Sequence, residues 1–171
     1  EGVTITGEGQ HALVTYIRTD SVRISPDFAS KTLHYVKEKY GDKFAPARPN
    51  IYKTSEKAQD AHEAIRPISL ERTPESLKDK IDRDSYRLYK LIYERYLASQ
   101  MTAAEFYTMT VHITGETTGK PLGFAVKGKS VKFKGFTAVY TATSDKEEDK
   151  DELGTMPDLK EGDKFELADI V

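Results

Sequence analysis

Residues 15–21 hold the first side chains whose types and spacing favour chemistry. Tyr16, Arg18 and Asp20 alternate along this run. If 13–18 is an extended strand, Tyr16 and Arg18 project from the same side, because strand side chains alternate. A tyrosine hydroxyl ionises near pH ~10, and a neighbouring guanidinium both stabilises the phenolate and clamps a phosphate. The run is compatible with attack by tyrosine on a phosphodiester, or with a plain half-buried strand that ends in an Asp-Ser turn.

Residues 61–67 contain the second group of candidate residues. A short helix is expected to begin after Ser55 and to end near Arg66-Pro67, which places His62 and Arg66 one turn apart on the same face. Histidine exchanges a proton near neutral pH or, when charged, hydrogen-bonds a phosphate oxygen. The alternative is a pair of cations that merely favour the C-terminal end of a helix.

The composition excludes several other kinds of site. The chain has 171 residues and no cysteine, so it has no disulfide, no cysteine-based zinc site and no thiol nucleophile. It has no glycine-rich phosphate loop. The lack of cysteine favours an intracellular setting. Apolar runs stay well below the ~18 residues of a membrane span, and no signal-peptide pattern is seen. No metal-ligand spacing joins its other histidines or its first aspartates: His11, His34, His112, Asp20, Asp27 and Asp42.

The elements that position the candidate residues are predicted to be helical as far as residue 102. Ser25-Pro26 is typical of a helix start and Gly41 of its end. Thr73-Pro74 repeats this start for a short helix over 74–80, and a longer helix follows over about 83–100. The expected apolar positions are Ala29, Leu33, Val36 and Tyr40 in the first helix, and Tyr89, Ile92 and Tyr96, flanked by Leu88, Leu91 and Leu97, in the last.

After residue 102 the pattern alternates as in β-strands. Strands are predicted over 105–114, 121–126, 130–134, 136–142 and 164–171, with a turn at 115–119 and an acidic loop over 144–155. We therefore predict an α+β chain, in which a mainly helical domain (1–102) precedes an antiparallel β-rich segment (103–171) that is incomplete. The net charge is only −2, but residues 120–134 carry five lysines and no acidic residue.

Both candidate runs resemble motifs of the type IA DNA topoisomerases. The run TYIRTDS at 15–21, with GEG at 7–9 and LV at 13–14 before it, is similar to the active-site tyrosine motif of that family. The run AHEAIRP at 61–67 resembles its second signature, in the form of the bacterial topoisomerase I branch. The resemblance implies that 1–102 is most of the helical domain carrying the nucleophile. It implies that 103–171 is part of a β-rich arch domain, and that the chain is a piece of a longer protein.

The resemblance also implies a role for each matched residue. Tyr16 would be the nucleophile that becomes linked to a 5′-phosphate and leaves a free 3′-hydroxyl. Arg18 would position and neutralise the scissile phosphate, and His62 would contact a DNA phosphate and assist cleavage. Asp20 and Arg66 would be further DNA-binding residues that support Arg18 and the backbone contact.

The family's cofactor and partners follow from the same resemblance. Mg²⁺ is held there by acidic residues of a Toprim domain, and no run here is similar to that array, so its ligands are expected outside this chain. The expected partners are single-stranded and negatively supercoiled DNA and the remaining domains of the parent, in a cytoplasmic, nucleoid-associated setting without a membrane. The reaction needs no ATP, and this chain alone is expected to be inactive.

Two other classes of function fit parts of the sequence. The lysines of 120–134, together with the tyrosines, suit a non-catalytic module that binds single-stranded nucleic acid. A soluble interaction domain, in which both motifs are accidental, is the third interpretation. Dependence on the Tyr16 hydroxyl separates the enzyme from the binding module.

Overall fold

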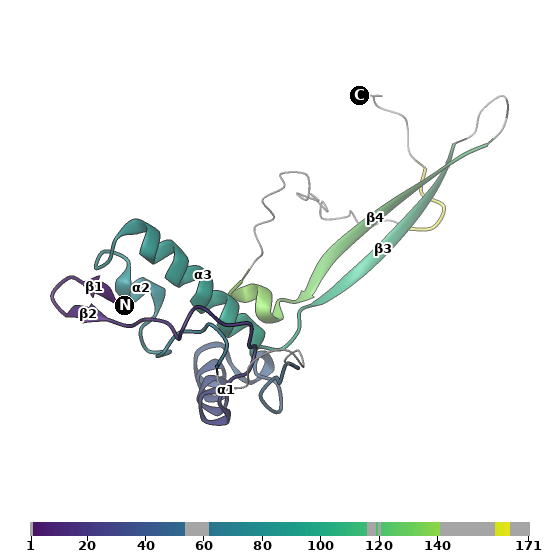
Figure 1. Ribbon diagram of the computed structural model, residues 1–171. Coiled ribbons are helices and arrows are strands. Elements are labelled where there is room, and N and C mark those ends of the chain that lie inside the picture. The colour runs from purple at the N-terminus through teal and green to yellow at the C-terminus, as the bar shows by residue number, and fades with distance from the viewer. Residues whose placement is uncertain (1, 54–61, 116–118, 120, 141–159, 165–171) are drawn as a thin grey trace. The chain divides into compact units, whose positions relative to one another are not determined.

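The computed structural model describes residues 2–53, 62–115, 119, 121–140 and 160–164 (Figure 1). The architecture is an α+β mix, which confirms the predicted fold class. Its described elements are, in chain order, β1 (Val3–Ile5), β2 (Gly9–His11), α1 (Pro26–Tyr40), the 3-10 helix η1 (Asp42–Phe44), α2 (Pro74–Leu77), α3 (Arg83–Ser99), β3 (Glu105–Gly115), β4 (Leu122–Phe133) and the 3-10 helix η2 (Gly135–Ala138).

The described residues divide into two compact units. The first comprises those within Glu1–Ala104 and Lys134–Ala142, and the second those within Glu105–Phe133 and Thr143–Val171. The first unit therefore contains the α-helices, the β1–β2 hairpin and η2, and the second contains the β3–β4 hairpin. No described helix has the length and apolar character needed to cross a membrane.

The ends of α1 are confirmed, but its buried face is shifted from the predicted one. Pro26 opens the helix after Ser25, and Gly41 follows its last residue with φ +97. Ala29, Thr32 and Val36 are buried, whereas Leu33 is only half-buried. Burial of Thr32 is possible because its hydroxyl donates to the Phe28 carbonyl at 2.8 Å and pairs with the Tyr96 hydroxyl at 2.7 Å.

Helix α3 supplies most of the core through its tyrosines. Its N-cap Asp82 accepts hydrogen bonds from the backbone N–H groups of Asp84 and Ser85. The predicted flank of Leu88 and Leu91 is wrong, because these side chains are 59% and 48% exposed. The predicted positions Tyr89, Tyr96 and Leu97 are buried, together with Tyr93 and Ala98. Tyr89, Tyr93 and Leu97 build the hydrophobic core with Ile5, Leu13, Val36, Leu77 and Met101.

Buried tyrosine hydroxyls need partners, and α3 finds them in the loop that precedes α2. Tyr89 donates to the carbonyl oxygen of Arg72 at 2.6 Å, and Tyr93 donates to that of Leu70 at 2.7 Å. The tyrosines therefore tie residues 70–72 to the core. Helix α2 itself ends at Leu77 rather than at residue 80.

The helix expected to end at Arg66-Pro67 is not present over the described residues 62–67; its first part, 54–61, lies outside the described residues. The backbone N–H groups are instead bound across the chain, since that of Ala64 donates to Arg23 at 2.8 Å and that of Ile68 to Leu13 at 3.0 Å. An isolated antiparallel bridge joins Val14 and Pro67. The one-turn spacing of His62 and Arg66 is therefore wrong.

The second unit contains a single long hairpin. The strand predicted over 105–114 is confirmed as β3, and the separate strands predicted over 121–126 and 130–134 are one continuous strand, β4 (Figure 1). The antiparallel register pairs Thr108 with Lys129 and Val111 with Val126. One face therefore carries Thr108, Thr110, His112, Lys127 and Lys129, and the other carries Met109, Val111, Ile113, Phe124 and Val126.

The strand predicted over 136–142 is wrong, because Gly135–Ala138 forms η2 in the first unit. The Phe136 N–H donates to the Thr102 carbonyl oxygen at 2.9 Å. Gly135 has φ +48, and a Cβ there would lie 2.5 Å from the carbonyl carbon of Ala103, so only glycine fits. The acidic loop over 144–155 lies outside the described residues, as do most of the strand predicted over 164–171 and part of the turn predicted over 115–119.

Candidate active site

Tyr16 lies on an irregular segment and is open to solvent. The strand predicted over 13–18 does not form: the pairing is limited to the Val14–Pro67 bridge, where the Thr15 N–H donates to the Arg66 carbonyl at 3.0 Å and the Ile68 N–H donates to that of Leu13 at 3.0 Å. The chain then turns outward, and the Tyr16 side chain is 59% exposed. Within this chain, the phenol is therefore not enclosed by the core.

The structure brings Tyr16 and His62 together. Their ring centroids are 5.3 Å apart and the ring planes are inclined by 34°. His62 is half-buried and belongs to the segment that pairs with residues 13–15. The two runs that hold the candidate residues thus meet at one place, through backbone pairing rather than through a shared helix or strand.

Arg18 and Asp20 are both exposed on the same irregular segment. Neither takes part in an ion pair within the described part of the chain. Two side-chain turns shape the backbone that follows, since Thr19 Oγ1 accepts from the Ser21 N–H at 2.9 Å and Ser21 Oγ accepts from the Arg23 N–H at 3.2 Å. The Arg18 side chain is thus exposed and available to an anion.

Arg66 is placed differently from the other candidates, because it is only 9% exposed. Its Nε and Nη2 donate to Glu63 Oε2, and Nη1 donates to the Pro67 carbonyl at 2.9 Å. The guanidinium carbon lies 3.8 Å from the centroid of the Phe28 ring. These surroundings favour a structural role for Arg66 over the DNA contact expected from the sequence.

Sequence reasoning missed two residues that shape the site, Thr15 and Glu63. The Thr15 hydroxyl donates to the Ala64 carbonyl at 2.7 Å and accepts from the Arg66 N–H at 3.0 Å. Glu63 stands three residues before Arg66 in AHEAIRP, so an acidic partner close to Arg66 in the chain was visible in the sequence. Thr15 had no comparable signal, because its partners lie in a distant part of the sequence.

Comparison with known proteins identifies the family. The sequence model of a DNA topoisomerase family matches residues 9–171. The chain belongs to the bacterial type I DNA topoisomerases. This confirms the resemblance drawn from TYIRTDS and AHEAIRP.

A solved structure supports the same assignment. Full-length topoisomerase I from Thermotoga maritima is 30% identical to this chain and superposes with a TM-score of 0.61. The match covers 81% of this chain but only 21% of the Thermotoga chain. The topoisomerase chain described here thus corresponds to about a fifth of that enzyme.

The described part of this topoisomerase chain offers no obvious metal site. Among the described residues, no group of three or more histidines, cysteines, aspartates or glutamates could hold a metal ion. These residues therefore do not fit a Mg²⁺ site, and no step is assigned to Mg²⁺ on this chain.

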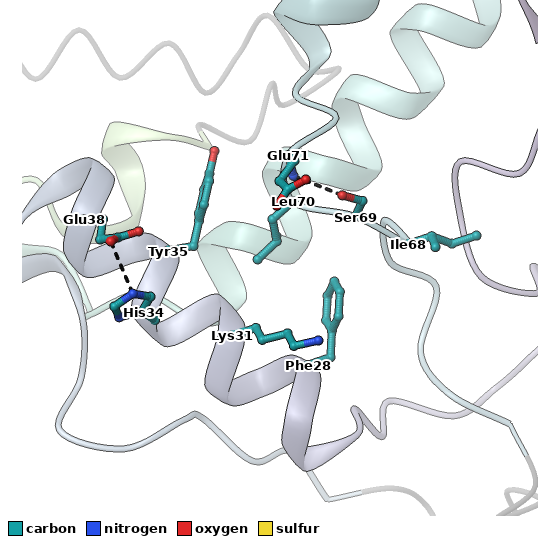
Figure 2. Close-up of a pocket in the computed structure, with 9 residues that line it drawn as sticks. All are labelled: Phe28, Lys31, His34, Tyr35, Glu38, Ile68, Ser69, Leu70 and Glu71. Atoms are coloured by element: carbon teal, nitrogen blue, oxygen red, sulfur yellow. Dashed lines mark hydrogen bonds and ion pairs between the residues drawn. The ribbon is translucent and has the colours of Figure 1, made fainter. Parts of the chain in front are cut away.

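A cavity of about 360 Å³ lies elsewhere on the topoisomerase chain, between α1 and residues 68–71 (Figure 2). Tyr16 and His62 do not line it. His34 at its edge is paired with Glu38 at 3.2 Å. The candidate active site is therefore the exposed surface around Tyr16 and not this cavity.

Proposed function

We propose that this chain is the tyrosine-bearing part of a type IA DNA topoisomerase that relaxes negatively supercoiled DNA without ATP. The observation that carries the proposal is the exposed Tyr16 ring next to the imidazole of His62. An exposed phenol on an irregular segment suits a nucleophile that must reach a phosphodiester inside a large substrate. A core tyrosine such as Tyr93 has its hydroxyl bound inside the protein and does not suit that task.

In the proposed reaction, the Tyr16 oxygen attacks a backbone phosphorus of single-stranded DNA. A bond forms between this oxygen and phosphorus as the bond between phosphorus and the 3′-oxygen breaks. The phenol loses its proton, and the departing 3′-oxygen gains one. The product is a 5′-phosphotyrosyl ester with a free 3′-hydroxyl. Because the ester retains the energy of the phosphodiester, religation after strand passage is the reverse attack and needs no ATP.

The proposed roles of the other residues follow from charge and position. Arg18 neutralises the scissile phosphate through its paired N–H donors, and His62 hydrogen-bonds a phosphate oxygen beside Tyr16. Asp20 supports Arg18. The partners are DNA and the remaining domains of the parent chain, which also supply any Mg²⁺ ligands, and the enzyme acts in the cytoplasm at the nucleoid.

The deciding experiment is covalent capture of single-stranded DNA by the full-length parent enzyme. Tyr16→Phe removes only the hydroxyl, so we expect it to abolish the denaturant-resistant DNA adduct while non-covalent binding persists. Tyr107→Phe is a matched control, because Tyr107 is similarly exposed at 61% but lies on the hairpin. A persistent adduct in the Tyr16 variant would reject the proposal.

A second measurement addresses the isolated chain. Because the rest of the parent is needed for strand passage, we expect the 171-residue chain to leave a negatively supercoiled plasmid unrelaxed. Relaxation by the purified chain would contradict this part of the proposal.

The alternative function is a non-catalytic module for single-stranded nucleic acid. The hairpin favours it, because Lys127 and Lys129 share one face with three polar residues of β3, and Lys129 Nζ lies 3.7 Å from the Phe106 ring centroid. Such a module would bind with a salt-dependent affinity that is indifferent to Tyr16→Phe and would form no adduct.

A further inference from the structure

Glu63 and Arg66 form an ion pair that is largely enclosed by the protein. The exposed fractions of their side chains are 27% and 10%. Two guanidinium nitrogens of Arg66 converge on one carboxylate oxygen of Glu63, and a third donates to the carbonyl of Pro67. The Phe28 ring of α1 covers the guanidinium face, with its centroid 3.8 Å from the guanidinium carbon. The pair therefore fixes the segment from 63 to 67 against α1.

Thr15 fixes the same segment from the other side. Its hydroxyl bridges the Ala64 carbonyl and the Arg66 N–H, and its own N–H donates to the Arg66 carbonyl. Tyr16 directly follows Thr15, and His62 directly precedes Glu63. The adjacent rings of Tyr16 and His62 are thus next in the chain to residues that contact Arg66, namely Thr15 and Glu63.

We infer that Glu63 and Arg66 are positioning residues that hold His62 against Tyr16. The inference rests on the proposed function of Tyr16 and His62 as the reacting pair. Neither positioning residue is assigned a contact with the scissile phosphate, because the donors of Arg66 and one oxygen of Glu63 are already engaged inside the protein. Loss of the carboxylate charge would leave an enclosed guanidinium without its counter-ion and would release the segment that begins at His62.

The first test measures the distance between the two rings and needs no DNA. In the 171-residue chain, a nuclear Overhauser effect is expected between ring protons of Tyr16 and His62, whose centroids are 5.3 Å apart. Glu63→Gln and Arg66→Lys are expected to abolish this signal in the folded protein. The matched controls Glu71→Gln and Arg87→Lys alter exposed residues that form no ion pair in the described part of the chain, and should preserve it.

Thermal unfolding of the same variants separates positioning from plain stabilisation. A pair that only stabilises the fold would lower the midpoint while the folded variants keep the Tyr16–His62 signal, and this result would overturn the inference. If Arg66→Lys fails to fold, the Tyr16–His62 signal of Glu63→Gln tests the positioning role alone. This variant is expected to fold, because it keeps the shape of the side chain at a position that is 27% exposed.

The second test uses covalent capture by the full-length enzyme. With an active wild type, Glu63→Gln and Arg66→Lys should slow adduct formation about 10-fold or more at unchanged DNA affinity, since small displacements of reacting groups have effects of that size. Weaker DNA binding with normal cleavage of bound DNA would make Arg66 a DNA contact and overturn the inference. A wild-type enzyme that forms no adduct would reject the proposed function, and the ring–ring signal would still decide the positioning role.

Discussion

The Tyr16 ring packs against the His62 ring across two chain segments that are neither helix nor strand. Backbone pairing between residues 13–15 and 66–68 brings the segments together, and the Thr15 hydroxyl adds a hydrogen bond to the Ala64 carbonyl. The proposed chemistry therefore depends on the geometry of two irregular segments. Substitutions of Tyr16 and His62 are expected to affect reaction rate more than stability, and substitutions in the core are expected to do the reverse.

Replacement of His62 tests its proposed role in cleavage. His62→Ala should lower the rate of adduct formation in the full-length enzyme by about 10²-fold, the scale seen when one stabilising donor is removed from a transition state. DNA affinity should change far less, because Arg18 and the rest of the enzyme remain. The rate of capture under single-turnover conditions is the measurement. His34→Ala, at an exposed histidine of α1 that pairs with Glu38, should react at the wild-type rate, and an equal loss in both variants would contradict the assignment.

Two leucines on α3 test which face of that helix is buried. Leu97 is completely buried, so Leu97→Ala should destabilise the protein by about 2–5 kcal/mol. Leu88 is 59% exposed, so Leu88→Ala should change stability by no more than about 0.5 kcal/mol. Chemical denaturation of both variants measures these values. Similar losses at the two positions would mean that the face is assigned wrongly.

The buried tyrosines predict a loss of stability in alkaline solution. Burial raises the pKa of Tyr89 and of Tyr96 to about 12, above the value of about 10 in an unfolded chain. Between these values the unfolded chain loses protons that the folded chain keeps, so stability is complete below pH ~10 and falls as the pH rises towards ~12.

Thermal unfolding from pH 8 to 11 measures this effect. Tyr89→Phe should make the decline of the midpoint above pH ~10 shallower. Tyr107→Phe, at an exposed position of the hairpin, should leave the decline as it is in the wild type. The prediction fails if the Tyr89 variant declines as steeply as the wild type.

Local signals in the sequence predicted the elements that they control. Ser25-Pro26 and Gly41 gave both ends of α1, because a proline start and a glycine end act within one turn. The alternating pattern over 105–114 likewise predicted the strand β3. On α3 the predicted positions Tyr89 and Tyr96 are buried, whereas the predicted flank of Leu88 and Leu91 is exposed. Spacing alone did not separate Leu88 from its neighbour Tyr89, because both side chains are large and largely apolar.

The candidate site was predicted by motif resemblance and not by periodicity. A helical spacing for His62 and Arg66 and a strand for Tyr16 and Arg18 were both reasonable from the residues alone. Both were wrong, because the N–H groups of Ala64, Arg66 and Ile68 bind residues 13–23 instead of their own segment. Such long-range pairing leaves no local pattern in a single sequence.

The position of Gly135 at the exit of the β3–β4 hairpin has a consequence for changes in the length of the hairpin. The strands of the hairpin start and finish as neighbours, with Glu105 opposite Phe133, and the residues just outside them are joined through Thr102 and Phe136. Because its two ends are adjacent, the hairpin is equivalent to an insertion at one position of the first unit. Changes in the length of the hairpin are therefore expected to leave the helices folded, provided that Gly135 is kept.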